Sequence, residues 1–240
     1  MILELDLGNT RGKWRIVAGD AIVARGVGQV AAWRAGDLPA WPTVERVRIA
    51  SVLSESAERE LATVLLTLNA PIAFARSTPQ CAGVISAYKE VQRLGVDRWL
   101  GMLAAYTEFQ RAVLVVDAGS ALTLDLVNAD GRHQGGYIIP GARLMADALL
   151  HSTDRVRFDG DGLLASTAAG RVTGDCVHHG IALALAGAVR LGLLQARERL
   201  GEVELILAGG DADALALLLT GESVHLRPDL VLDGLRQALP

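Results

Sequence analysis

The 240-residue sequence predicts an α/β protein made of two halves with a similar order of elements. Each half opens with three short strands and continues with a mixture of helices and strands. In each half the first strand runs into a loop that contains an aspartate, a glycine and small residues. A duplicated unit explains these observations most economically. We expect two lobes, at 1–111 and 112–240.

The first half shows clear turn signals and one strong helical pattern. Gly8 and the pair Gly19-Asp20 separate the three opening strands. Leu61, Leu65 and Leu68 recur on one face of an amphipathic helix. The elements that we expect are strands at 2–5, 13–17, 21–27, 47–50 and 71–75, and helices at 55–68 and 96–110.

The second half repeats this order. Asp130-Gly131 suits the turn of a hairpin between its second and third strands. The expected elements are strands at 112–116, 122–127, 135–139, 203–207 and 224–226, and helices at 141–150, 174–199, 212–219 and 229–238.

Charge and composition favour a protein that acts on small molecules over one that binds nucleic acids. The chain has 27 acidic and 23 basic residues, for a net charge of −4. No run of five like charges forms the basic face that nucleic acids require. Fifty-one percent of the residues are hydrophobic and 21% are charged, as in ordinary globular proteins.

The N-terminus and the cysteines indicate a cytoplasmic protein. Glu4 and Asp6 interrupt the apolar N-terminus, which lacks the basic region of a signal peptide. The apolar stretches are shorter than the roughly 20 residues that span a bilayer. Cys81 and Cys176 lie far apart without zinc-finger spacing, so we expect reduced thiols.

The first loop, after the opening strand, has the residues of a phosphate-binding turn. Gly8 lets the backbone approach an anion, and the loop amides with Asn9 and Thr10 can donate hydrogen bonds to phosphate oxygens. Lys13 adds positive charge, and Asp6 could hold a hydrated Mg²⁺. A plain hairpin with Gly8-Asn9 as its turn remains the alternative.

The corresponding loop of the second half is Asp117-Ala118-Gly119-Ser120. Two Asp-x-Gly loops of this kind could grip the phosphate chain of a nucleotide from both sides. Two unrelated hairpins with the same acidic start and glycine explain the pattern less well.

A third segment, Gly95-Val96-Asp97-Arg98, opens a predicted helix. Asp97 could be the general base for a substrate hydroxyl, and Arg98 could pair with an anionic group of the substrate. A simple helix cap at Asp97 explains the same position.

Two glycine-containing segments give weaker signals. Glycines and a proline in 135–141 suggest close approach to backbone or ligand. Ala208-Gly209-Gly210-Asp211 leads from a strand into a helix N-terminus, which suits a phosphate or sugar. Ordinary turns explain both. The chain lacks the Gly-x-x-x-x-Gly-Lys-Ser/Thr loop of P-loop kinases.

These motifs, in this order, resemble the type III pantothenate kinase family over most of the chain. Ser120 stands where that family usually has threonine, and it keeps the hydroxyl. The matching segments are Asp6–Lys13, Tyr88 with Gly95–Arg98, Val116–Thr123, Gly135–Gly141 and Thr173–Gly180.

The resemblance implies the ribonuclease H-like fold of actin-like ATPases and of acetate and sugar kinases. It implies transfer of phosphate from ATP to pantothenate, the first step of coenzyme A biosynthesis. It further implies Mg²⁺ carried by ATP, a monovalent cation (K⁺ or NH₄⁺) at Asp117, and a homodimer. The implied site residues are catalytic Asp97; Asp6, Leu7, Gly8, Asn9, Thr10, Arg11, Gly12, Lys13 and Ser120 for ATP; and Tyr88, Gly95, Val96, Asp97, Arg98 and Thr173 for substrate.

Two other functions remain compatible with the sequence. One is a kinase of the same fold that acts on a sugar or acid. The other is a nucleotide-responsive regulatory or accessory protein, against which the charge pattern argues if it must bind DNA directly.

Overall fold

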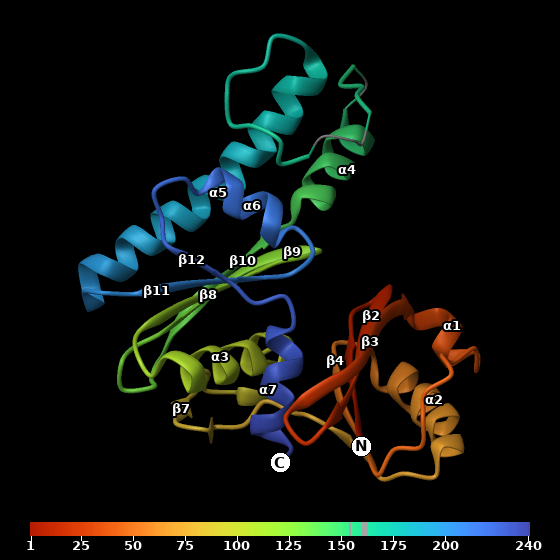
Figure 1. The fold of residues 1–240 in the computed structure, drawn as a ribbon. Helices are drawn as coiled ribbons and strands as arrows, with labels where there is room; N and C mark the ends of the chain where they lie inside the picture. Colours follow the sequence, from red (N-terminus) through yellow and green to blue (C-terminus); the bar gives the residue numbers. More distant parts are fainter. Residues whose placement is uncertain (154, 160–162) are drawn as a thin grey trace. The chain divides into compact units, whose positions relative to one another are not determined.

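The computed structural model describes residues 1–153, 155–159 and 163–240, which form two compact units (Figure 1). Unit 1 comprises Met1–Ala82, Tyr88–Ala104 and Leu230–Pro240, and unit 2 comprises Gly83–Ala87 and Ala105–Asp229. The C-terminal segment therefore belongs with the N-terminal half of the chain. The lobe boundary that we expect near residue 111 stays a prediction.

Unit 1 is built on a five-stranded sheet in the order β3-β2-β1-β4-β5. The central strand β1 pairs antiparallel with β2, which pairs antiparallel with β3. On its other side β1 pairs parallel with β4, and β4 pairs parallel with β5. The strands are β1 (Ile2–Leu7), β2 (Arg11–Ala18), β3 (Ala21–Gln29), β4 (Arg46–Ser51) and β5 (Ile72–Phe74).

Unit 2 repeats this topology. Its sheet has the order β10-β9-β8-β11-β12, with β8 central, antiparallel to β9 and parallel to β11. The two sheets therefore share strand order and strand direction, which confirms the predicted duplication of two α/β lobes. The strands are β8 (Val113–Ala118), β9 (Ala121–Val127), β10 (His133–Pro140), β11 (Glu204–Ala208) and β12 (Val224–Leu226).

Side chains of β1 alternate between two layers of unit 1. Leu3, Leu5 and Leu7 are buried in the core that α1 (Val30–Arg34) and α2 (Glu55–Leu65) cover. The residues between them point to the opposite face, because successive side chains of a strand alternate. Asp6 therefore lies on the same face as Glu4.

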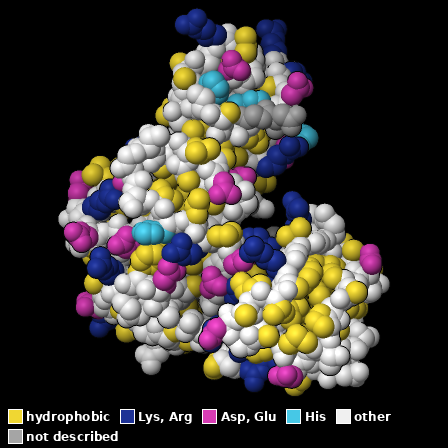
Figure 2. All heavy atoms as spheres, in the orientation of Figure 1, with side chains coloured by type: hydrophobic (Ala, Val, Ile, Leu, Met, Phe, Trp, Pro, Cys, Tyr) yellow, Lys and Arg dark blue, Asp and Glu magenta, His cyan; other side chains and the backbone are white. Residues whose placement is uncertain are grey.

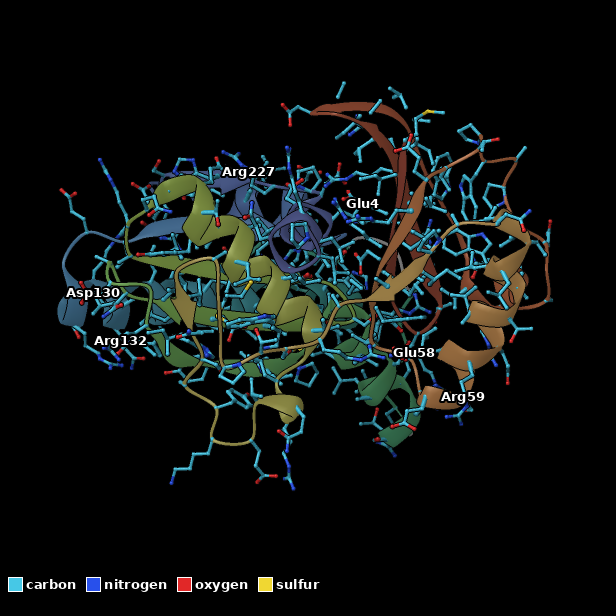
Figure 3. The ribbon with its side chains drawn as sticks, turned by 90° about the horizontal axis from the view of Figure 1, so that it is seen from below. Glu4, Glu58, Arg59, Asp130, Arg132 and Arg227 are labelled. Atoms are coloured by element: carbon cyan, nitrogen blue, oxygen red, sulfur yellow. The ribbon has the colours of Figure 1, made fainter. Side chains whose placement is uncertain are left out.

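That second face holds a buried ionic cluster. Glu4 accepts hydrogen bonds from Arg15 Nε at 2.6 Å and from Arg48 Nη1 at 3.0 Å, and all three residues are buried. Figure 3 shows Glu4 among the strands of unit 1. Arg15 also donates to Asp233 of α7 (Leu230–Ala238) at 2.6 Å. The cluster thus ties the C-terminal helix to the N-terminal sheet.

Helix α7 also lies directly against α3 (Val96–Phe109). A Cβ atom at Gly234 would come within 2.2 Å of the carbonyl oxygen of Leu100. Only glycine allows two helix backbones to approach so closely. The first turns of α3 therefore lie on the same face of the unit 1 sheet as Asp6.

The core of unit 2 lies between its sheet and α5 (Thr173–Leu200). Leu122 and Leu124 of β9 pack with residues such as Leu185 and Val189 of α5. Two shorter helices, α4 (Ala142–Ser152) and α6 (Ala212–Leu218), adjoin α5 (Figure 1). Because side chains of β8 alternate, Asp117 projects from the face opposite to α5.

Helix α5 is long and apolar enough to cross a membrane by length and composition alone, a test that the core helix of a soluble protein also passes. Its most apolar 18-residue window has a mean hydropathy of 1.5 and is 33% buried. Part of this apolar character comes from the face that enters the unit 2 core, with Leu185 and Val189. The rest comes from exposed leucines, Leu183, Leu191 and Leu194.

Most predicted elements are present with small shifts, and a few were missed. The predicted helix 55–68 ends as an α-helix at Leu65 and continues as a 3₁₀ turn. The one-turn helix α1 was not predicted, because it depends on a distant contact of Trp33. The ring of Trp33 fills the space beside Gly12 and Gly28, where added Cβ atoms would lie 2.3 and 2.7 Å from it. The unpredicted strands are β6 (Gln80–Cys81) and β7 (Val84–Ile85).

Candidate active site

The first loop is a tight turn at the carboxyl end of β1. The amide of Gly8 donates to the Arg11 carbonyl at 3.1 Å, and the Thr10 carbonyl accepts from Val30 at 3.0 Å. Asp6 lies opposite Lys13 on β2. The loop is therefore a hairpin whose turn has Asn9 and Thr10 at its centre, one residue later than the Gly8-Asn9 turn of the simpler alternative, and both residues are exposed.

The residues of this loop differ in what they can offer a ligand. Asn9, Thr10 and Arg11 are exposed. Leu7 is buried in the core, so only its backbone is available. Gly12 is buried against the ring of Trp33. This packing alone explains why a glycine occupies the position, without any ligand. The half-buried members are Asp6, Gly8 and Lys13.

The second loop occupies the equivalent place in unit 2. The amide of Gly119 donates to the Ala121 carbonyl at 3.0 Å, which closes the turn between β8 and β9. Asp117 lies opposite Thr123 on β9 and Ala208 on β11. It thus stands where Asp6 stands in unit 1, at the carboxyl end of a central strand, the edge where α/β sheets bind their ligands.

Both weaker glycine motifs converge on this second loop. Gly141 donates from its amide to the Ser120 carbonyl at 3.0 Å, and a Cβ at Gly141 would lie 2.2 Å from the Gly119 carbonyl oxygen. Gly209 has a φ of +95°, and its Cβ would lie 2.5 Å from Asp117 Oδ1. The glycines therefore bring two further backbone segments against the aspartate loop.

Asp211 follows Gly209 at the N-terminus of α6. Its backbone amide donates to the Ala118 carbonyl at 2.9 Å, and its side chain makes no capping hydrogen bond. Burial raises the pKa of the Asp211 carboxyl. An acid that is partly desolvated at a helix N-terminus beside a phosphate-type loop is consistent with a ligand-facing position.

The start of α3 brings five of the predicted substrate residues together in unit 1. Arg98 Nη1 donates to the Tyr88 hydroxyl at 3.0 Å, with the guanidinium carbon 5.8 Å from the ring centre. Asp97 Oδ1 accepts the Arg98 amide at 2.8 Å, and a Cβ at Gly95 would lie 2.6 Å from that oxygen. Val96 is buried and anchors the turn.

Asp97 is the second residue of α3, and the first helical hydrogen bond runs from Trp99 to the Gly95 carbonyl at 3.0 Å. Asp97 is thus inside the first turn and is not the capping residue that precedes the helix. One carboxylate oxygen serves the helix terminus, where a negative charge is favourable. The half-exposed side chain keeps a second oxygen.

Thr173 is the first residue of α5 and is exposed. It lines an apolar cavity of about 1030 Å³ between α4 and α5, with Leu144, Met145 and Cys176 among the lining residues. Thr173 is thus on α5, whereas Ser120 is in the turn between β8 and β9. Thr173, Asp117 and Ser120 belong to unit 2, whereas Asp6, Tyr88 and Asp97 belong to unit 1.

The histidines near Cys176 are close to backbone carbonyl oxygens. His178 Nε2 lies 2.8 Å from the Asp159 carbonyl oxygen, and His179 Nδ1 lies 2.7 Å from the Ala168 carbonyl oxygen. Within the parts of the chain that the structure describes, no three His, Cys, Asp or Glu side chains gather as metal ligands.

Comparison with known proteins decides the family. The sequence model described as type III pantothenate kinase matches residues 2–193. The type III pantothenate kinase of Chromohalobacter salexigens is 42% identical over 249 residues, covering 100% of this chain and 88% of the relative. The enzyme of that name from Pseudomonas aeruginosa is 42% identical over 254 residues, covering 100% and 99%.

The chain belongs to the type III pantothenate kinase family. The family resemblance seen in the ordered motifs is thereby confirmed, and so is the assignment as a phosphotransferase.

Solved structures confirm the fold class of this type III pantothenate kinase family member. A candidate Baf-family transcriptional activator from Campylobacter jejuni superposes with a TM-score of 0.63 at 20% identity, covering 98% of this chain and 95% of that one. A candidate 2-dehydro-3-deoxygalactonokinase from Sinorhizobium meliloti gives 0.59 at 15% identity, covering 98% and 97%. At these identities the likeness concerns the fold alone.

Sequence reasoning left some neighbours of the site unassigned. Gly141 and Gly209 lie against the second loop, yet their motifs are equally compatible with ordinary turns. The signal was present as repeated glycine at strand-to-helix junctions, but glycine alone does not say which backbone it admits. A buried pair, Asp125 and His133, gave no signal because the two residues fit no motif.

Proposed function

We propose that this protein transfers the γ-phosphoryl group of ATP to the primary alcohol of pantothenate, giving 4′-phosphopantothenate in the first step of coenzyme A biosynthesis. The observation that carries the proposal is the grouping of Tyr88, Asp97 and Arg98 at the start of α3, in a chain of this family. Asp97 is a candidate general base for the primary alcohol of the substrate. Arg98, beside it, is a cation that could pair with the substrate's carboxylate.

Two loops would hold the nucleotide. The amides and side chains of Gly8, Asn9 and Thr10, with the charges of Arg11 and Lys13, suit phosphate oxygens. The Ser120 hydroxyl would contribute from the second loop. Catalysis of phosphoryl transfer depends mainly on alignment and charge neutralisation, so the loops supply most of what the reaction needs.

The residues present fit the cations that this reaction implies. Asp117 offers a carboxylate, and the lack of a Cβ at Gly119 and Gly209 lets their backbone lie close to its Oδ1. Hard cations prefer such oxygen ligands. Asp117 would hold K⁺ or NH₄⁺, and Asp6 would orient the Mg²⁺ that ATP carries. Bound cations would offset the charge of the phosphates.

The pantothenate residues have separable tasks. Asp97 would orient the alcohol and accept its proton as the phosphoryl group moves. Arg98, whose guanidinium lies on Tyr88, would pair with polar or anionic groups of the substrate. Gly95 and Val96 would shape the backbone of this segment. Thr173 would reach pantothenate from the N-terminus of α5.

A homodimer is part of the proposal. Leu183, Leu191 and Leu194 of α5 are each more than half exposed, as are Tyr137 and Ile138 of β10. Figure 2 shows hydrophobic side chains at the surface where α5 lies. An exposed apolar surface of this kind is typical of a subunit interface.

Leu191→Arg is expected to shift the protein from dimer to monomer, because an unpaired charge would be buried at the interface. Light scattering after size exclusion measures the mass directly. Leu217→Arg is the matched control, since Leu217 is a still more exposed leucine, at 78%, on α6. A Leu191→Arg protein that keeps the mass of the wild type contradicts an interface at α5.

We propose that the protein acts on small molecules in the cytoplasm, with no membrane or nucleic-acid partner, and its net charge of −4 argues against a nucleic-acid partner. The direct test of function is a coupled kinase assay with ATP and pantothenate, with and without K⁺. We expect ATP- and K⁺-dependent formation of phosphopantothenate. Turnover of another small alcohol in its place would indicate a different kinase, and salt-dependent retention on DNA without turnover would indicate a regulator.

A further inference from the structure

Strands β9 and β10 carry a buried His–Asp pair that the proposed chemistry does not use. His133 Nε2 lies 3.1 Å from Asp125 Oδ1, and the two side chains are 0% and 2% exposed. Burying an ionisable pair has a desolvation cost, and an apolar pair of similar volume often serves a core equally well. Contribution to stability alone is therefore a weak explanation for this pair.

A β-bulge in β10 lies between His133 and the residue that pairs with Asp125. His133 lies opposite Val127, but Gly136 lies opposite Asp125, so β10 has one extra residue between these two pairings. Gly135 within this stretch has a φ of +98°, which glycine tolerates. Bulges re-aim side chains and are frequent near active sites. Asp125 and His133 thus share the face of the sheet opposite to the α5 core.

The other ring nitrogen of His133 faces a backbone amide. The Ala87 N–H donates to His133 Nδ1, with the two nitrogens 3.5 Å apart. Because Nδ1 accepts this hydrogen bond, the proton of the neutral ring is on Nε2, where it is donated to Asp125. The buried carboxylate therefore fixes both the tautomer and the orientation of the imidazole.

The same hairpin holds the rest of segment 83–87. Ile85 donates its amide to the Gly131 carbonyl at 2.9 Å, and a Cβ at Gly131 would lie 2.0 Å from the Gly83 carbonyl oxygen. Figure 3 shows Asp130 and Arg132 at the edge of the molecule, where the hairpin turns. The hairpin therefore contacts the segment at Gly83 and Ile85, and His133 accepts a hydrogen bond from its last residue, Ala87.

Ala87 immediately precedes Tyr88, the residue whose hydroxyl meets Arg98 beside Asp97. We propose that Asp125 and His133 are positioning residues for the phosphoryl acceptor: they hold the Ala87 backbone and so fix the course of the chain into Tyr88. The inference rests on the proposed role of Tyr88 in binding pantothenate. It assigns to the pair no contact with substrate.

The test is the double variant Asp125→Leu/His133→Leu, which removes both buried polar groups of the pair together and takes away the acceptor of the Ala87 amide. We expect the KM for pantothenate to rise about tenfold, because binding groups that are slightly misplaced lose much of their effect. The KM for ATP should stay within about twofold, since the phosphate loops are elsewhere. Amide hydrogen exchange in segment 83–89 should become faster.

A second variant separates geometry from charge. Asp125→Asn keeps an oxygen that accepts from His133 Nε2, so we expect the pantothenate KM to stay closer to that of the wild type than in the double variant. The matched control is Glu204→Leu/His225→Leu, which removes the other His–carboxylate pair of this sheet, with atoms 3.0 Å apart. It should leave the pantothenate KM unchanged.

A folded double variant with wild-type pantothenate KM would overturn the proposal, whatever its exchange rates. Equal increases in the KM values of ATP and pantothenate would also overturn it, because they would indicate general loosening of the structure. If the double variant does not fold, Asp125→Asn/His133→Leu takes its place, because it also removes the acceptor of the Ala87 amide, and a wild-type pantothenate KM in that folded variant decides against the pair. Absence of pantothenate turnover in the wild type would instead refute the proposed function.

Discussion

Asp97→Asn is expected to lower kcat for pantothenate phosphorylation by about 10³-fold, the scale typical of losing a general base. The amide keeps an oxygen that can accept the Arg98 amide, as the carboxylate does at 2.8 Å. The helix terminus should therefore stay intact and the melting temperature should change little. The KM for ATP should also stay near the wild-type value, because the phosphate loops are untouched.

Steady-state kinetics with both substrates, together with a thermal melt, measure this effect. Glu90→Gln provides a matched control, since Glu90 is an exposed carboxylate whose pairing with Arg93 lies only a few residues before α3. The control should retain full activity. A folded Asp97→Asn enzyme with wild-type kcat would show that Asp97 only stabilises the helix terminus.

Local patterns were sufficient to predict most of the architecture. The alternation Leu3, Leu5 and Leu7 buries one face of β1, and such alternation is readable without tertiary information. The duplicated opening of three strands reappears as two sheets with the same strand order. Helix α1 was not predicted because its stability depends on Trp33, whose ring fills the space beside Gly12 of β2 and Gly28 of β3.

The candidate site was predictable where its chemistry is local. The two Asp-x-Gly loops and the segment at Asp97 each carry their residues within a few positions, and in the structure the Tyr88 hydroxyl lies 3.0 Å from Arg98 Nη1. The Asp125–His133 pair and the approach of Gly209 to Asp117 depend on strand register and on residues far apart in the chain. No local spacing encodes such contacts.

The Asp117–Ser120 loop, which we propose binds ATP, packs closely against Gly209. The Gly209 φ of +95° is a conformation that costs a residue with a side chain about 1–3 kcal/mol. In addition, a Cβ atom would lie 2.4 Å from the Ala118 carbonyl oxygen and 2.5 Å from Asp117 Oδ1. Gly209→Ala must therefore displace either the loop or the aspartate that we assign to the monovalent cation.

We expect Gly209→Ala to lower kcat/KM for ATP by about 10²-fold, as ångström-scale displacement of binding groups can do. The KM for K⁺ should rise with it, and the melting temperature should fall. Gly210→Ala is the matched control, because a Cβ at the adjacent glycine meets nothing within 4 Å. If the two variants show the same ATP and K⁺ dependence, the space beside Asp117 has no role in holding nucleotide or cation, and the assignment of this loop fails.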